Sequence, residues 1–300
     1  MPTTIAGIAP MAVDAPQVLR TRPDARLHRG AARWVVLAVA GLFALAMLSP
    51  FVIMAMNAFK SPSDYSQNGP LGLPTEFYTT GLVNFWNRTN FPVKLFNSIM
   101  ISGLVAVFGT LLSLISAYAI GIGRIKGRVW IVAIFLVANM LPQEAIIYPL
   151  FTMANAVGLS NSQWSVIIIF TVIQSAFGTY LLSSVLGTFP VELLEAAALD
   201  GAGRFRILWS VVYPILRPTL GVLMVFFFIW TWNEFFNPLV MLTSNATQTV
   251  PIALASLQGD RMMDAPTTNA GALVSLLPAL VFFLIFQRTL TRGVTAGAVK

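Results

Sequence analysis

The sequence of 300 residues contains no cysteine and a single histidine, and only 10% of its residues are charged. Without cysteine the chain forms no disulfide and offers no thiolate ligand or thiol nucleophile. The histidine, His28, stands in an arginine-rich N-terminal stretch, where a solvated side chain is expected. A membrane enzyme would need a constellation of His, Cys or clustered carboxylates, and we find none on either side of the apolar segments.

Apolar residues take the place of the missing charges. A soluble domain is typically about a quarter charged, whereas 57% of this chain is hydrophobic. The net charge of +7 would favour nucleic-acid binding in a soluble protein, but here the basic residues lie between apolar runs and orient membrane helices. The composition therefore predicts an all-α, polytopic membrane helix bundle.

Six segments reach the length of about 20 mostly apolar residues that crosses a bilayer. Residues 1–33 are rich in proline, lack an apolar period and are predicted to form a disordered cytoplasmic tail. The first apolar run is too long for a signal-peptide core and is expected to remain as an anchor. The predicted transmembrane helices are 34–56, 97–122, 130–152, 164–186, 219–242 and 270–287.

Lysine and arginine give the orientation of these helices. With a cytoplasmic N-terminus, all but four of the 18 basic residues fall on the inside. Such an asymmetry is a strong positive-inside signal, so both termini are predicted to be cytoplasmic. The four exceptions, predicted outside, are Lys60, Arg88, Lys94 and Arg261.

The long inner segment 187–218 has a helical pattern of its own. Pro190 suits the first position of a helix, and Glu192 follows in the first turn, where the helix dipole favours an anion. Gly201 can adopt the left-handed conformation that often ends a helix. A second short helix is expected from Arg204 to Trp209.

Two prolines, Pro214 and Pro218, are expected to break the chain before the fifth transmembrane helix. The resulting elbow is rich in alanine, so a partner can approach its backbone closely. An alternative is an elbow that lies on lipid headgroups, but anionic lipid would repel its acidic residues, Glu192, Glu195 and Asp200.

At this point the chain resembles a known family. Glu195-Ala196-Ala197 followed by Gly201 matches the EAA signature of binding-protein-dependent ABC importer permeases. The family pattern continues with Ile-x-Leu-Pro, where this chain has Val211-Val212-Tyr213-Pro214 and so keeps the proline but not the Ile and Leu. Further residues resemble the maltose-type carbohydrate permeases in particular: Asn97-Ser98, Trp232-Asn233-Glu234, and the ending from Gln287-Arg288 to Lys300. The resemblance covers about residues 95–300.

The resemblance implies the type I ABC importer permease fold for a sugar-transport subunit of the inner or plasma membrane. In that family the inner loop forms coupling helices that sit in a cleft of a cytoplasmic ATPase. The implied domains are 34–94 (first helix and extracellular loop), 95–288 (permease domain) and 289–300 (cytoplasmic tail). The implied ATPase-coupling residues are Glu192, Glu195, Ala196, Ala197, Asp200, Gly201 and Pro214.

The implied partners are a second permease subunit in a heterodimer, an ATPase homodimer and an extracellular or periplasmic sugar-binding protein. The chain has no G-x-x-x-x-G-K-[S/T] loop, so ATP and Mg are expected on the ATPase and no cofactor on this chain. The chain is accordingly predicted to be a transport subunit and not an enzyme.

Polar residues within the apolar runs are costly unless paired or hydrated, and they suggest a substrate path. Glu144 and Glu234 each lie roughly 25 Å along the helix from the basic residue at its inner end, and Gln174 falls at a similar level. On the fifth helix the i, i+3, i+4, i+7 spacing predicts one shared face for Trp230, Asn233, Glu234 and Asn237. The path candidates are Gln143, Glu144, Gln174, Trp230, Asn233, Glu234 and Asn237.

Other interpretations stay open. The path residues could instead bond helices to each other or to the partner permease. The importer could carry another solute, such as glycerol phosphate, a polyol or a peptide. A proton-coupled secondary carrier could use Glu144 and Glu234, although such carriers often show internal repeats, which we do not find. Small residues at four-residue spacing predict close packing of the second helix; they are Gly109, Ser113, Ala117 and Gly121. Pro142 and Pro278 predict kinks in their helices.

Overall fold

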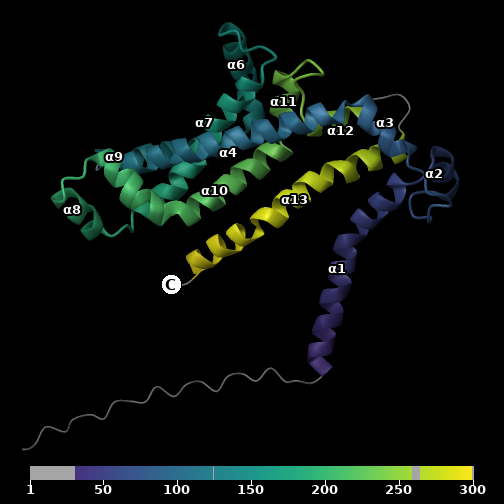
Figure 1. The fold of residues 1–300 in the computed structure, drawn as a ribbon, viewed down its shortest axis with the longest axis horizontal. Coiled ribbons are helices and arrows are strands. Elements are labelled where there is room, and N and C mark those ends of the chain that lie inside the picture. The colour runs from purple at the N-terminus through teal and green to yellow at the C-terminus, as the bar shows by residue number, and fades with distance from the viewer. Residues whose placement is uncertain (1–30, 124, 259–263, 299–300) are drawn as a thin grey trace, which may run out of the picture. The chain divides into compact units, whose positions relative to one another are not determined.

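A computed structural model describes residues 31–123, 125–258 and 264–298, and this part of the chain is all helical (Figure 1). The predicted N-terminal tail lies almost entirely outside the described residues. The chain divides into two units, 1–50 and 51–300, and the second contains the functional elements. The helices are α1 Ala31–Ala58, α2 Pro62–Asn68, α3 Thr80–Arg88, α4 Phe91–Gly121, α5 Arg128–Met140, α6 Gln143–Ala156, α7 Gln163–Leu186, α8 Val191–Leu199, α9 Arg204–Ile207, the π-helical turn η1 Leu208–Val212, α10 Tyr213–Asn233, α11 Phe236–Met241, α12 Val250–Gln258 and α13 Ala265–Ala298.

Five helices of the described part are long and apolar enough to cross a membrane. The pair α5 and α6 makes a sixth when it is counted as one bent segment. This agrees with the predicted bundle of six transmembrane helices. The five are Arg33–Ala58, Phe91–Gly121, Gln163–Leu186, Arg204–Asn233 and Ala265–Gln287.

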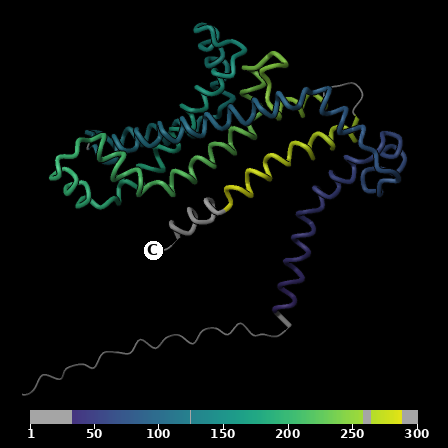
Figure 2. Tube along the Cα trace, in the orientation of Figure 1, coloured from purple at the N-terminus to yellow at the C-terminus, as the bar shows by residue number. Residues whose placement is uncertain are grey.

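Helices α4, α7 and α10 form the centre of the second unit (Figure 2). The small residues of α4 permit this close packing, as predicted. A Cβ on Gly109 would lie 3.0 Å from the Phe227 ring of α10, and one on Gly121 would lie 3.0 Å from Leu186 of α7. Between them Ser113 is fully buried, and its hydroxyl donates to the Gly109 carbonyl at 2.7 Å.

The predicted third transmembrane helix, 130–152, is broken at the predicted kink at Pro142, and the break is sharper than a kink within one helix. The axes of α5 and α6 differ by 98°. Leu141 and Pro142 between them are extended, with ψ of 129° and 127°. A proline ring disfavours the helical conformation of the residue before it, so the chain turns at this point. Pro278, in contrast, lies inside α13 without ending it.

The predicted bounds of the fifth transmembrane helix, 219–242, were wrong. The helix begins at Arg204, passes Pro214 and Pro218 and ends at Asn233. Proline lacks the N–H that an α-helix needs, and the turn before Pro214 widens into η1, where the Tyr213 N–H donates to the Leu208 carbonyl. The helix therefore continues where a break was expected.

The segment 57–96, predicted as an outer loop, contains two short helices and the start of α4. Two of its cations are buried: the Lys60 ammonium donates to the Gly69 carbonyl and the Lys94 ammonium to Asn245 Oδ1, both at 2.7 Å. Hydrogen bonds from the Asn68 side chain and the Thr75 backbone N–H keep the pKa of Asp64 below its usual value. This region is thus a folded part of the second unit.

Candidate functional site

The inner segment forms the predicted elbow, made of α8, α9 and the residues between them. Helix α8 starts one residue after Pro190, which takes the N-cap position instead of the predicted first helical position. Glu192 lies in the first turn. Gly201 follows the helix with φ of +78°, the left-handed conformation that the sequence predicted.

One face of the elbow is fastened to the bundle. Leu194, Ala197 and Ala202 pack against the apolar core that contains Ile207 and Leu208. The Tyr118 hydroxyl of α4 donates a hydrogen bond of 2.9 Å to the Arg204 carbonyl of α9. These contacts keep the elbow folded although its other face has no cover.

The opposite face of the elbow is exposed, and it carries both charge and apolar surface. Its charged members are Glu192, Glu195 and Asp200. Beside them Leu199 is 88% and Phe205 75% exposed. Sequence reasoning did not select Phe205, although an aromatic residue between two arginines is a usable signal for a docking surface.

The remaining predicted coupling residues divide between the two faces. Ala196 and Gly201 are exposed, whereas Ala197 is turned toward the core. Pro214 is exposed but stands in the first turn of α10, beyond η1, and not on the elbow.

A second group of candidates lines a small pocket at the far end of α10. The pocket has a volume of about 280 Å³ and takes residues from α6, α7 and α10 and from the residue after α10. Five of the seven predicted path residues line this pocket. Phe170 also lines it, but it was not selected from the sequence because it stands within an apolar run. The lining residues, which we call the polar pocket, are Gln143, Phe170, Gln174, Trp230, Asn233 and Glu234.

Glu234 is held firmly beside this pocket. It follows the last residue of α10 in extended conformation, so it is not inside a helix as predicted. Its Oε1 accepts hydrogen bonds from the backbone N–H groups of Phe236 and Asn237, at 3.1 and 3.3 Å. Its Oε2 accepts none from the described residues, and this oxygen is available to a ligand.

Two amides near Glu234 have unused acceptors. Gln174 is 6% exposed; its Nε2 donates to Thr231 Oγ1 at 2.9 Å, while its Oε1 is buried without a partner among the described residues. The Asn237 Nδ2 donates to Gln143 Oε1 at 3.2 Å, and its buried Oδ1 has no partner in the same part of the chain. Both acceptors are enclosed by protein atoms, and buried acceptors without donors are costly.

Glu144 does not line the pocket: it is exposed in the first turn of α6, and its place in a substrate path stays a prediction. The predicted position of Asn237 was wrong. Asn237 does not share a face of α10 with Trp230, because α10 ends at Asn233 and Asn237 belongs to α11. The break in the chain nevertheless brings Asn237 to Gln143.

Trp230 gives the pocket an aromatic wall. Its ring packs edge-on against Phe177 with centroids 5.1 Å apart, and it also contacts Phe226 and Phe227. With 42% of its surface exposed, part of the ring remains free. An aromatic face beside amides and a carboxylate can stack on the C–H face of a sugar while the polar groups bond its hydroxyls.

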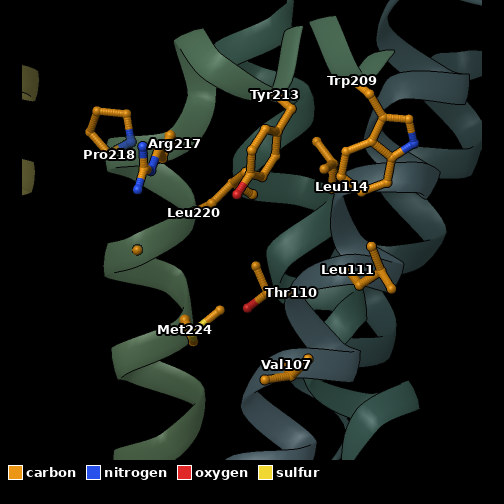
Figure 3. A pocket seen from close by; sticks show the side chains of 11 residues that line it. Val107, Thr110, Leu111, Leu114, Trp209, Tyr213, Arg217, Pro218, Leu220 and Met224 are labelled. Atoms are coloured by element: carbon orange, nitrogen blue, oxygen red, sulfur yellow. The ribbon is translucent and has the colours of Figure 1, made fainter. Parts of the chain in front are cut away.

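A larger groove between α4 and α10, of about 730 Å³, has a different character (Figure 3). The hydroxyls of Thr110 and Tyr213 point into it, and Arg217 lies at one end (Figure 3). Most of its surface is apolar, and its lining contains no amide or carboxylate side chain. Its lining residues are Val107, Thr110, Leu111, Leu114, Trp209, Tyr213, Arg217, Pro218, Leu220, Gly221 and Met224.

One continuous helix connects the elbow to the polar pocket. It runs from Arg204 to Asn233, 30 residues, which is about 45 Å at 1.5 Å per residue. Its first residues belong to the elbow beside α8 (Figure 1). Its last residues, Trp230 and Asn233, line the pocket. Within the described residues no group of three or more His, Cys, Asp or Glu side chains could hold a metal ion.

Comparison with known proteins gives a family match. Residues 109–295 match the family described as binding-protein-dependent transport system inner membrane component. The inner membrane ABC transporter permease protein YcjP of Escherichia coli (strain K12) is 30% identical over 261 residues, covering 86% of this chain and 93% of that protein.

Similar relatives include two with named sugars. The melibiose/raffinose/stachyose import permease protein MelC of Bacillus subtilis (strain 168) is 26% identical, covering 89% of this chain and 96% of its own. The trehalose transport system permease protein SugB of Mycobacterium tuberculosis (strain CDC 1551 / Oshkosh) is 32% identical, and the match covers 70% of this chain and 77% of SugB. A solved bacterial ABC transporter that imports the acidic polysaccharide alginate has the same fold, with a TM-score of 0.71, 22% identity and coverage of 86% and 95%.

Proposed function

The chain belongs to the family of binding-protein-dependent transport system inner membrane components, and from that premise we propose that it is a permease subunit of an ATP-driven sugar importer. Such a subunit is a multi-pass inner-membrane protein and is not catalytic. Sugar as the solute is supported by the relatives for melibiose and trehalose and by the aromatic and amide lining of the polar pocket.

The observation that carries the proposal is the helix Arg204–Asn233, because it joins an exposed docking elbow to a polar pocket. A transporter driven from one side must transmit the movement of its motor to the substrate path. A packed helix about 45 Å long transmits such a movement as a rigid element. A proton-coupled carrier has no ATPase subunit to bind, so it would not need an exposed docking elbow.

The elbow is the proposed contact with a cytoplasmic ATPase homodimer, which binds ATP and Mg; this chain holds no cofactor of its own. Exposed apolar residues next to charges, here Leu199 and Phe205 beside Glu195, are typical of a surface that a protein partner covers. A second permease in a heterodimer completes the path. The family description names a binding protein as part of the transport system, and we propose that this protein binds sugar and delivers it from outside the membrane.

Both termini are proposed to be cytoplasmic, and the absence of cysteine makes this simple to test. Single cysteines would replace Leu199 on the elbow and Leu73 at the other end of the bundle, which are 88% and 75% exposed. An impermeant maleimide should label Leu199→Cys in inside-out vesicles and Leu73→Cys in right-side-out vesicles. The reverse pattern would overturn the orientation.

Purification of the tagged chain from a detergent extract tests the whole proposal. We expect a second permease and an ATPase to be recovered with it, and ATP hydrolysis to rise with a sugar-loaded binding protein. A chain that purifies alone and moves solute under a proton gradient would be a secondary carrier instead.

A further inference from the structure

We propose that the polar pocket selects uncharged, hydroxyl-rich sugars and rejects acidic or phosphorylated ones, with Glu234 as the specificity-determining residue. This inference rests on the proposed sugar-import function and narrows its substrate class. It is drawn from the groups that line the pocket and from their unused hydrogen-bonding capacity.

The pocket offers a carboxylate oxygen that lacks a donor. Glu234 lines the pocket and is partly exposed, and its Oε2 has no hydrogen-bond donor among the described residues. The acceptors of Gln174 and Asn237 that also lack a donor are enclosed by protein atoms, so a ligand in the pocket does not reach them. A sugar hydroxyl donates a hydrogen bond and would satisfy Glu234 Oε2. A carboxylate or phosphate group at neutral pH offers this oxygen no donor.

The carboxylate of Glu234 cannot easily move away from an incoming anion. Two backbone N–H groups, of Phe236 and Asn237, hold its Oε1, and this fixes the direction of the second oxygen. An acidic ligand in the pocket would therefore meet a fixed like charge at close range.

No lining residue compensates for this charge. The lining of the polar pocket contains no Lys, Arg or His. Arg217, which lies in the apolar groove, is in the early part of α10 and about 25 Å along the helix from Glu234. A similar fold occurs in an importer of an acidic polysaccharide, so the fold does not set the charge of the substrate. In this chain the lining of the polar pocket decides the charge of the substrate. This lining argues against glycerol phosphate as the solute.

The test measures sugar binding by the purified importer complex through the fluorescence of Trp230, with Trp230→Phe as the blank. The probes are neutral disaccharides (melibiose, trehalose, maltose and lactose) and analogues in which one hexose is replaced by its uronic acid. We expect at least one neutral sugar to bind and its acidic analogue to bind at least tenfold more weakly.

Glu234→Gln keeps an oxygen for the two backbone N–H groups but removes the charge. It should reduce the preference for the neutral sugar to about twofold or less. Glu76→Gln is the matched control, since this exposed carboxylate lies outside the pocket, and it should leave the preference unchanged.

Stimulation of ATP hydrolysis by sugar-loaded binding protein is measured in parallel to separate the two proposals. An importer that responds to sugar but binds no neutral probe in the pocket, binds both probes equally, or keeps its preference in Glu234→Gln would overturn this inference alone. An importer that responds to no sugar would overturn the proposed function.

Discussion

At the scale of single residues, Gly201 has the most constrained backbone of the elbow. Its φ of +78° lies in the left-handed region, and no atom lies within 4 Å of the place where a Cβ would stand. A side chain there would meet no steric clash with neighbours and would cost only backbone strain, about 1–2 kcal/mol. The direction of the chain between α8 and α9 depends on this conformation.

Gly201→Ile should therefore uncouple ATP hydrolysis from transport, because a β-branched residue resists the left-handed turn. A cost of 1–2 kcal/mol corresponds to roughly a five- to thirtyfold loss of the native elbow conformation. The measurement is solute moved per ATP hydrolysed in proteoliposomes.

Gly203→Ile is the matched control for this prediction. Gly203 is equally open but has φ of −68° in the extended region, which isoleucine adopts freely. In Gly203→Ile the amount of solute moved per ATP hydrolysed should stay within about twofold of the native value. Equal losses in both variants would show that bulk on the elbow, and not the left-handed turn, matters.

At the scale of helices, Gly178 of α7 is the closest contact of the α4–α7–α10 centre. A Cβ there would overlap the Ser113 hydroxyl and lie 2.8 Å from Ser113 Cβ and 2.9 Å from Leu223 Cδ2. Gly178→Ala should destabilise the bundle by about 1–3 kcal/mol. That corresponds to a fall in Tm of roughly 2–4 °C per kcal/mol, measured by thermal unfolding in detergent.

Two further variants make the Gly178 prediction specific. Ser113→Gly removes the obstructing atoms and should restore part of the lost Tm in combination with Gly178→Ala. Gly103→Ala in α4 meets no atom within 4 Å and should be neutral or slightly stabilising, because alanine favours a helix over glycine. Equal Tm values for Gly178→Ala and Gly103→Ala would contradict the packing argument.

Hydrophobicity predicted which elements exist better than where they bend. The fourth transmembrane helix was predicted at 164–186 and is found at Gln163–Leu186, because its apolar run ends where the helix ends. In 130–152 and 219–242 the apolar run continues through a turn of the chain, so its length conceals the break. Pro142 marks one break by a local rule. Glu234 marks the second break, between α10 and α11, because its carboxylate accepts a hydrogen bond from the backbone N–H of Phe236 after the turn.

The same limit applies to the site. Spacing on an assumed helix correctly brought Trp230, Asn233 and Glu234 together, but it placed Asn237 on the wrong element. Glu144 and Glu234 looked equivalent in sequence, and only the 98° bend before α6 separates them. Burial of individual polar atoms, such as Gln174 Oε1, depends on contacts between distant helices and has no counterpart in the sequence pattern.

At the scale of the whole second unit, the two candidate sites lie at different depths along one helix. The elbow end and the end with α3 and α12 are opposite ends of the bundle (Figure 2). In the proposed complex, an ATPase that holds the elbow and a sugar that occupies the polar pocket do not touch each other. We therefore propose that the helix Arg204–Asn233 and its packing against α4 couple the two sites. Changes to the docking charge should act on assembly before they act on sugar binding.

Glu195→Lys tests this separation. Reversal of an exposed charge on the docking face opposes a complementary partner surface, so recovery of the ATPase with the tagged chain should fall about tenfold or more. Sugar binding in the polar pocket of the purified chain should remain. Glu76→Lys makes the same charge change at an exposed residue before α3, at the other end of the bundle, and should leave ATPase recovery intact. Native-level ATPase recovery with Glu195→Lys would mean that Glu195 contributes nothing to docking.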